Sequence, residues 1–130
     1  MQISDVSQTA DWKSEKHVPA IEVPETMKSG EPFMVTVSVG KEIAHPNTTE
    51  HHIAWIDVYF KPEGDKFAYQ VGHFDFRSHG ASVKGPNTGP VYTHPFATFS
   101  MTVESSGTLI AVEHCNIHGL WENSLEIEVE

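Results

Sequence analysis

Apolar and polar residues alternate along most of the chain, which is the pattern of β-strands that bury one face. The clearest stretch is 32–39, where valine occupies every second position from Val35 to Val39. Other stretches rich in β-branched and aromatic residues predict strands at 52–60, 67–76, 97–105, 107–114 and 124–130. No stretch of helical length has apolar residues at a 3.6-residue period. The pattern therefore predicts an all-β protein.

Turn-forming residues separate the predicted strands. They include KPEGDK (61–66), SSG (105–107), HGLWEN (118–123) and a longer loop, SHGASVKGPNTGP, at 78–90. A chain of 130 residues is the size of one domain, and no linker or repeat divides it. About seven short strands at this spacing are typical of an antiparallel β-sandwich. We expect one domain over residues 1–130, with a loosely structured N-terminal segment at 1–14.

The charge balance excludes one class of partner. The chain has 18 Asp and Glu against 8 Lys and Arg, for a net charge of −10. Nucleic-acid binding needs a basic surface, so no nucleic-acid partner is expected. No run of 18 apolar residues predicts a membrane span, and the N-terminus lacks the basic-then-apolar pattern of a signal peptide. These features favour a cytoplasmic protein.

The residues best able to bind a transition metal are one cysteine and nine histidines. A single cysteine excludes an internal disulfide and any site that needs several cysteines from one chain. A lone cysteine is most often a small buried hydrophobic residue. Cys115, however, has His114 beside it and His118 three residues further on. This spacing makes a metal ligand the alternative to a core residue.

Two further histidines can approach the same point through a turn. Successive strand residues point to opposite faces, so His51 and His52 cannot both face one centre in an extended segment. Pro46 follows His45 and predicts a turn, which brings His45 near His51. At Cys115 the strand is expected to leave the sheet, so that Cys115 and the histidine three residues later point inward together. The spacing allows a ligand set of His17, His45, His51, Cys115 and His118.

The ligand types narrow the choice of metal. Imidazole binds iron, copper, nickel and zinc, but five protein ligands exceed the four of a structural zinc site. A blue-copper site needs a weak axial methionine after the Cys–His stretch, and the last methionine, Met101, precedes Cys115. Five-coordinate iron with one open position fits best. A cupredoxin-like electron-transfer protein and a zinc-stabilised β-sandwich are the alternatives.

Three motifs in order carry a family resemblance: EKHVP (15–19), HPNTTEHH (45–52) and HCNIHGLWE (114–122). Together they resemble the superoxide reductase family, also called neelaredoxin or the iron centre II domain of desulfoferrodoxin. The resemblance runs from about residue 15 to the C-terminus. It implies an immunoglobulin-like sandwich of seven strands and one iron with four equatorial histidines and an axial cysteine. On this sequence those ligands are His17, His45, His51, His118 and Cys115.

The resemblance also implies an activity. The family reduces superoxide to hydrogen peroxide with one electron and two protons, and forms no dioxygen. Lys16 is then expected to attract the anionic substrate, because a local cation offsets the acidic charge of the protein. Glu15 is expected to be a sixth ligand in the oxidised state only, because a carboxylate is a hard ligand that suits Fe(III).

Partners follow from the same resemblance. Some relatives carry an N-terminal domain with a second iron held by four cysteines, but the 16 residues before His17 contain no cysteine. We therefore expect the one-iron type, with electrons supplied directly by a rubredoxin-type donor. A homotetramer or homodimer is expected.

Residues around the predicted site are expected to play supporting roles. The backbone N–H groups of Asn116 and Ile117 are candidates to hydrogen-bond the cysteine sulfur. Glu113 and His114 are expected to be surface or outer-shell residues, not ligands. Core or subunit-contact positions are expected for Trp55, Phe60, Phe74, Phe76 and Trp121. For Trp121, which is close to the metal loop, shielding of the site is the alternative.

Overall fold

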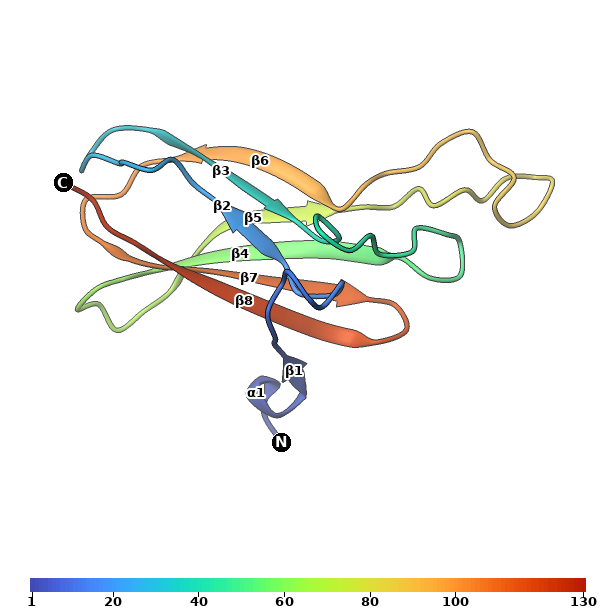
Figure 1. Cartoon of the computed structure of the whole chain (residues 1–130), viewed down its shortest axis with the longest axis horizontal. Coiled ribbons are helices and arrows are strands. Elements are labelled where there is room, and N and C mark those ends of the chain that lie inside the picture. Colours follow the sequence, from blue (N-terminus) through green and yellow to red (C-terminus); the bar gives the residue numbers. More distant parts are fainter.

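Two mainly antiparallel sheets, packed face to face, make up the computed structural model, which describes residues 1–130 (Figure 1). The larger sheet has the order β1-β8-β7-β4-β5, and the smaller one has the order β2-β3-β6. The only helix, α1, is four residues long (Ile3–Val6). The strands are β1 (Ser7–Gln8), β2 (Ala20–Glu22), β3 (Phe33–Ser38), β4 (Ile53–Pro62), β5 (Tyr69–Asp75), β6 (Phe96–Met101), β7 (Gly107–Cys115) and β8 (Gly119–Ile127).

Alternation of burial explains why these segments are strands. In β3, Val35 and Val37 are fully buried, whereas Met34, which points to the opposite face of the strand, is 51% exposed. Ile56 of β4 and Leu109 of β7 are likewise fully buried and face the core between the sheets. Burying each such side chain contributes about 1.5–3 kcal/mol. The all-β sandwich predicted from the sequence is confirmed.

The last hairpin differs from the sequence prediction. Residues 118–123 were expected to be a turn, with the final strand at 124–130, but β8 already begins at Gly119. Gly119 pairs with Cys115, so the hairpin loop contains only three residues. Gly119 has a φ of 83°, a backbone conformation that glycine adopts without a steric penalty. This tight turn lets β8 start five residues earlier than its β-branched and aromatic content suggests.

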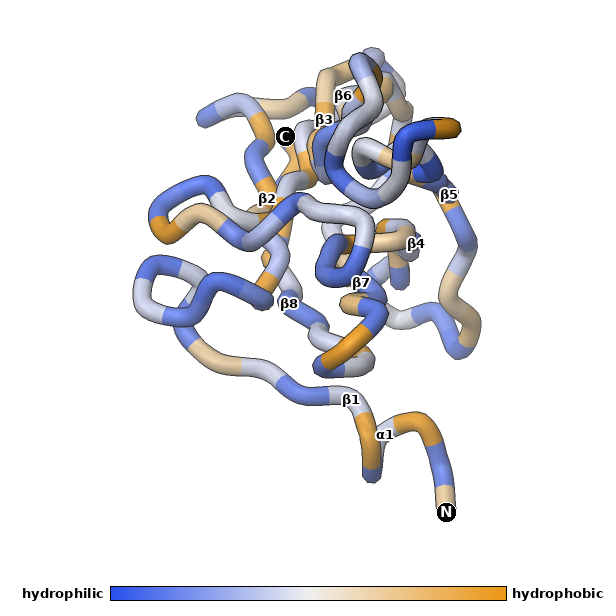
Figure 2. The backbone as a smooth tube through the Cα atoms, turned by 90° about the vertical axis from the view of Figure 1, so that its right-hand side faces the viewer, coloured by the Kyte–Doolittle hydropathy of each residue, from blue (hydrophilic) through white to orange (hydrophobic).

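The N-terminal segment forms α1 and the two-residue strand β1, which pairs in parallel with Leu120 and Trp121 of β8. This segment projects from the body of the sandwich (Figures 1 and 2). Three of its apolar side chains are exposed: Met1, Ile3 and Val6. No helix in the structure is long and apolar enough to cross a bilayer.

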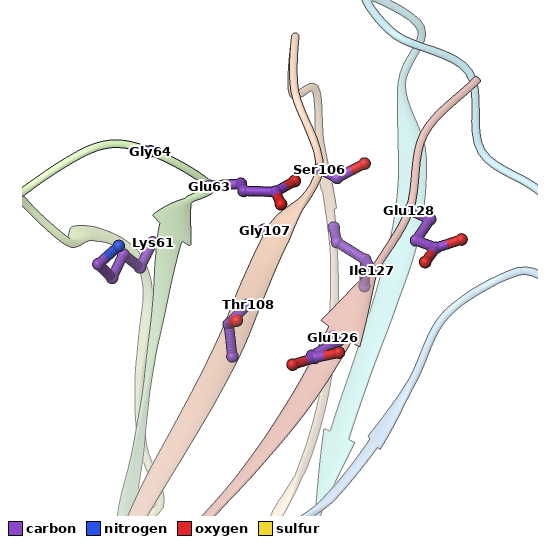
Figure 3. Close-up of a pocket in the computed structure, with 9 residues that line it drawn as sticks. All are labelled: Lys61, Glu63, Gly64, Ser106, Gly107, Thr108, Glu126, Ile127 and Glu128. Carbon is purple, nitrogen blue, oxygen red and sulfur yellow. The ribbon is translucent and has the colours of Figure 1, made fainter.

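The two ends of the sandwich differ in chemistry. At one end lie the β3–β4 loop, the β5–β6 loop and the β7–β8 turn, on the right in Figure 1. At the other end an open pocket is lined by acidic side chains, Lys61 and backbone (Figure 3). Glu63, Glu126 and Glu128 are the acidic members. All the predicted metal ligands belong to the first end.

Candidate metal centre

Four imidazole rings form a closed ring at the loop end of the sandwich. Neighbouring ring centroids are 4.9 Å apart for His17–His45, 4.7 Å for His45–His51, 5.0 Å for His51–His118 and 4.8 Å for His118–His17. The diagonal pair His17–His51 is 6.4 Å apart. The four centroids therefore lie near the corners of a square, and neighbouring rings meet at angles of 58° to 81°.

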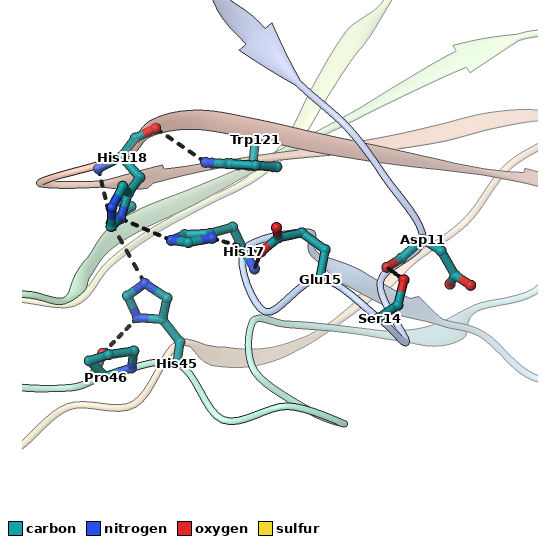
Figure 4. Close-up of polar contacts among 9 residues, drawn as sticks. Asp11, Ser14, Glu15, His17, His45, Pro46, His118 and Trp121 are labelled. Atoms are coloured by element: carbon teal, nitrogen blue, oxygen red, sulfur yellow. Dashed lines mark hydrogen bonds and ion pairs between the residues drawn. The ribbon is translucent and has the colours of Figure 1, made fainter.

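The four histidines reach this ring from three chain segments. His17 precedes β2, and His118 lies in the β7–β8 turn. His45 and His51 belong to the segment 45–52 that leads into β4, called the ligand turn below. Figure 4 shows His17, His45 and His118 converging from their separate segments. The four histidines that the sequence predicts to converge therefore lie together in the structure.

Cys115 closes the ring from the core side. It is the last residue of β7, fully buried, and part of the apolar core. Its Sγ lies 3.6 Å from His45 Nε2 and 3.8 Å from His118 Nδ1. Because the sulfur sits on the core side, a small molecule can approach the ring only from the opposite, solvent side.

The ligand atoms are gathered closely enough to share one ion. The nearest ligand atoms of His17, His45, His51 and Cys115 all lie within 4.8 Å of one another. His118 Nδ1 lies 3.2 Å from His17 Nε2. Two nitrogens at about 2.1 Å from one ion, and at right angles, would lie about 3.0 Å apart. The contact is close to that spacing.

His51 gives a second sign that the ring holds a metal. Its Nε2 is buried and has no hydrogen-bond partner within the protein. A buried polar atom without a partner costs about 1–3 kcal/mol. Four imidazoles and one thiolate are a donor set that iron accepts, and coordination would satisfy this nitrogen. The residues present therefore fit an iron ion.

The protonation state of His45 and His51 favours metal binding at neutral pH. Burial is the main cause that lowers the pKa of His45 to about 4, and the charges of His17, His51 and Lys16 act in the same direction. Burial also lowers the pKa of His51, with the neighbouring histidines adding to the effect. Metal ligands must be unprotonated. Both residues are thus neutral and ready to coordinate.

Glu15 orients His17. Its Oε1 accepts hydrogen bonds from the backbone N–H of His17 at 3.0 Å and from Nδ1 of the same residue at 2.8 Å (Figure 4). With Nδ1 donating, Nε2 is left unprotonated and faces the ring. Carboxylates commonly fix a ligand histidine in this way. The sequence placed Glu15 near the site but did not reveal this contact.

Lys16 lies close enough for its charge to lower the pKa of His45 and His51. No ion pair within the protein holds its ammonium group. A cation without a fixed partner beside the ring is available to an incoming anion.

Trp121 corrects one sequence expectation. It was assigned to core or subunit contacts, but its indole stacks on His17 with centroids 4.9 Å apart and planes at 15°. Its Nε1 also donates a hydrogen bond to the carbonyl oxygen of His118 at 3.2 Å (Figure 4). Trp121 therefore links two members of the ring that are far apart in the sequence. Among the other aromatic residues, Phe60 and Phe76 lie in the core, as expected.

The hydrogen bonding of the thiol also differs from expectation. The backbone N–H of Asn116 donates to the carbonyl oxygen of His52, not to the sulfur. Instead, the backbone N–H of His118 lies 3.4 Å from Cys115 Sγ. The reason is the tight hairpin turn, which directs the amide of its third residue back toward the sulfur. The Asn116 side chain meanwhile binds the backbone of the ligand turn, at His52 N–H and Glu50 C=O.

Glu113 is a buried residue that sequence reasoning placed at the surface or in the outer shell. It is fully buried, and neither carboxyl oxygen has a hydrogen-bond partner. Burial, with a smaller contribution from Glu15, raises the pKa of Glu113 to about 9. The carboxyl is therefore neutral at pH 7. Alternation along β7 could have revealed it, because residue 113 shares the inward face with Cys115.

The remaining histidines lie outside the ring. His52 points away from His51 and stacks on His79, with centroids 3.6 Å apart. His114 stacks on Trp55, and His73 pairs with Asp57 and Asp75 on the outer surface. His52 and His114 thus lie outside the ring, and their exclusion as ligands stays a prediction.

Comparisons with known proteins point to one family. The desulfoferrodoxin family model matches residues 9–124. Neelaredoxin of Megalodesulfovibrio gigas is 58% identical over 130 residues, which is 100% of both chains. Superoxide reductase of Pyrococcus furiosus is 55% identical over 126 residues, covering 97% of this chain and 99% of the relative.

A solved structure agrees. Superoxide reductase (neelaredoxin) from Archaeoglobus fulgidus in the reduced form has a TM-score of 0.89 at 58% identity, covering 95% of this chain and 99% of that chain. The immunoglobulin-like sandwich expected from the sequence resemblance is thereby confirmed. The eight strands exceed the expected seven because of the short β1. On its sequence, its fold and its His/Cys cluster, the chain belongs to the desulfoferrodoxin family.

Proposed function

We propose that this protein is a superoxide reductase, which converts superoxide to hydrogen peroxide at one iron ion without releasing dioxygen. The proposed ligands are His17, His45, His51, His118 and Cys115. One observation carries the proposal: a square of four imidazoles closed from the core side by the only thiol of the chain. Relatives at 55–58% identity bear the names superoxide reductase and neelaredoxin.

The protein holds its ligands in the state that a redox metal needs. The imidazoles of His45 and His51 are neutral because burial lowers their pKa. Cys115 lies in the apolar core, where substrate and solvent cannot reach the sulfur. When bound, the iron supplies the single electron that superoxide takes up. Two protons complete the reaction, which balances as superoxide plus one electron plus two protons giving hydrogen peroxide.

Lys16 is proposed to capture the substrate. The net charge of −10 repels a small anion at long range, so a local cation is needed near the entrance. The Lys16 ammonium has no ion-pair partner within the protein and lies near the ring. It can also donate a hydrogen bond to a negatively charged oxygen of the substrate.

Glu15 is proposed to have two roles. Its hydrogen bond with His17 is the main cause that lowers its carboxyl pKa, so it is ionised at neutral pH. In the structure described here it orients His17. In the oxidised state it is proposed to be the sixth ligand of the iron, because a hard carboxylate suits Fe(III). The hydrogen bonds to His17 use only Oε1, which leaves Oε2 without a partner in the protein.

The domain organisation, electron donor, cellular location and oligomeric state are also proposed. Residues 1–130 are proposed to form a single domain, which the one apolar core cluster between the two sheets supports. The electron donor is proposed to be of the rubredoxin type, as the family resemblance implies, and the location to be the cytoplasm. A homotetramer or homodimer is supported by the exposed apolar residues Met1, Ile3 and Val6 of the projecting N-terminal segment.

Metal analysis and a visible spectrum test this proposal. Purified protein should contain about one iron per chain, be colourless when reduced and turn blue when oxidised. Cys115→Ser should lose the colour, whereas His94→Asn should keep it, because His94 is exposed and outside the ring. Stopped-flow mixing with superoxide should give peroxide but no dioxygen.

Other results would point to the alternative functions. Copper with an intense colour and no reaction with superoxide would indicate an electron-transfer protein. Zinc would indicate a structural metal. Iron whose colour survives Cys115→Ser would show that the ligand set is wrong.

A further inference from the structure

The ligand turn has no regular secondary structure, although it carries two of the proposed ligands. Inside it, the Thr48 N–H donates to the His51 carbonyl at 2.9 Å, and the His51 N–H donates to Thr48 Oγ1 at 3.0 Å. These bonds shape the end of the turn near His51. They do not connect Thr49 and Glu50, at its tip, to the rest of the protein. The Asn116 side chain binds the Glu50 carbonyl, and the long loop between β5 and β6 makes the other contacts with the tip.

Asn87 of that long loop binds the tip of the ligand turn through three groups. Its Oδ1 accepts the Thr49 N–H at 2.8 Å, and its own backbone N–H donates to Thr49 Oγ1 at 3.2 Å. Its Nδ2 donates to both carboxylate oxygens of Glu50, at 2.9 and 3.2 Å. Thr49 Oγ1 in turn donates to the His79 carbonyl at 2.9 Å. The tip is thus held by both the side chain and the backbone of one residue.

The backbone conformation at residue 87 suits asparagine and few other residue types. Its φ is 58°, and it is the only non-glycine residue of the chain with a positive φ. Asparagine tolerates this left-handed conformation better than most residues, whereas glycine tolerates it but has no side chain. Only a residue that accepts this φ and also carries an amide can make all these bonds.

We propose that Asn87 is a positioning residue for the iron site, which holds the ligand turn so that His45 and His51 face the ring. The proposal rests on the iron site put forward above. Asn87 does not touch the ring and acts only through Thr49 and Glu50. It gives the long loop, whose His79 carbonyl also accepts a hydrogen bond from Thr49, a part in the function.

The position of Asn87 separates this role from a general effect on stability. Asn87 and Glu50 are both exposed, so their hydrogen bonds compete with water and contribute little to the free energy of unfolding. Losing these hydrogen bonds is expected to make the ligand turn less ordered. Loss of a group that hydrogen-bonds a metal ligand directly weakens metal binding by about 10- to 100-fold. Asn87 bonds the neighbours of the ligands and not the ligands themselves, so an effect at the low end of that range is expected.

Iron release tests the proposal on the holoprotein. Asn87→Asp keeps the acceptor for the Thr49 N–H but places a second carboxylate against Glu50. Asn87→Gly keeps the left-handed backbone and removes only the side chain. Val83→Asp is the matched control, because it adds the same charge at a fully exposed position of the same loop. The rate of iron transfer to a chelator is measured for each variant.

Asn87→Asp should release iron about 10-fold faster than Val83→Asp, at the low end of the expected range. Asn87→Gly should also release it faster. The double variant Asn87→Asp with Glu50→Gln should recover most of the wild-type retention, because the Gln amide can donate to the new carboxylate. Release at the Val83→Asp rate by both Asn87 variants, or no recovery in the double variant, would overturn the proposal.

Hydrogen exchange separates this proposal from the proposed function. The Thr49 amide donates to Asn87 Oδ1, so Asn87→Gly should lose its protection from exchange even in metal-free protein. Wild-type protein that binds no iron would refute the function but leave this exchange result standing. Unchanged exchange at Thr49 would overturn the positioning role whatever metal is bound.

Discussion

Trp121 allows a quantitative test of how the ring is held together. Its indole stacks on His17, and its Nε1 donates to the His118 carbonyl, so one side chain links the N-terminal and C-terminal ligands. A stacked aromatic pair contributes about 0.5–1.5 kcal/mol beyond the area it buries. A hydrogen bond between neutral groups contributes a similar amount, about 0.5–1.5 kcal/mol. The two contacts can be removed separately by choice of substitution.

Trp121→Phe keeps an aromatic ring on His17 but loses the hydrogen bond, so we expect a loss of about 1 kcal/mol. Trp121→Leu loses both contacts, so we expect about 2 kcal/mol. Urea unfolding of metal-free protein measures these losses. Trp55→Leu is the matched control, because Trp55 stacks on His114, which is outside the ring.

Iron retention then distinguishes a link between ligands from simple packing. Trp121→Leu should release iron faster than Trp121→Phe, and Trp55→Leu should retain it like the wild type even if its unfolding free energy falls. Equal release rates for Trp121→Leu and Trp55→Leu would refute the reasoning, because stacking on a ligand histidine would then have no special effect. Equal stability of Trp121→Phe and wild type would show that the indole hydrogen bond contributes nothing.

Three further predictions concern charged groups. Lys16→Ala should slow superoxide capture about 10-fold at low ionic strength and less at high salt; an unchanged second-order rate at low salt would contradict this. Glu15→Ala should keep most activity but alter the ferric spectrum, and a spectrum identical to wild type at every pH would exclude the sixth-ligand role. A hydrogen bond to Asp57, aided by the charges of Asp57 and Asp75, raises the pKa of His73 above 6.5. The ion pair of His73 therefore stabilises the fold fully below about pH 6.5, and this stabilisation is lost as the pH rises through the raised pKa. In urea unfolding, His73→Gln should lower the free energy of unfolding more at pH 5.5 than at pH 9. Equal losses at the two pH values would show that the pair does not stabilise the fold.

Much of the site could be predicted from local sequence because its ligands lie within short motifs. In the ligand turn, strand alternation excluded His52 as a partner of His51, and the turn after His45 brought that residue within reach. The β8 boundary could not be predicted in this way. It depends on the pairing of Gly119 with Cys115 across the hairpin, which no local pattern encodes.

Contacts between segments that are distant along the chain could not be predicted from the sequence. The links from Asn87 to Thr49, from Trp121 to His17 and from Asn116 to His52 each join residues at least 38 positions apart. Hydrogen bonds and stacking require particular distances and orientations, which only the packed chain defines.

The amino-acid sequence alone determined the fold class, the family and the identity of the candidate ligands, because alternation and short motifs are local properties. Only the tertiary structure decided which groups orient those ligands, that the Glu113 carboxyl has no hydrogen-bond partner and is neutral, and that the sulfur lies on the core side. Burial and hydrogen-bond partners arise when the two sheets and their loops pack together. They depend on neighbours in space, which the order of residues along the chain does not reveal.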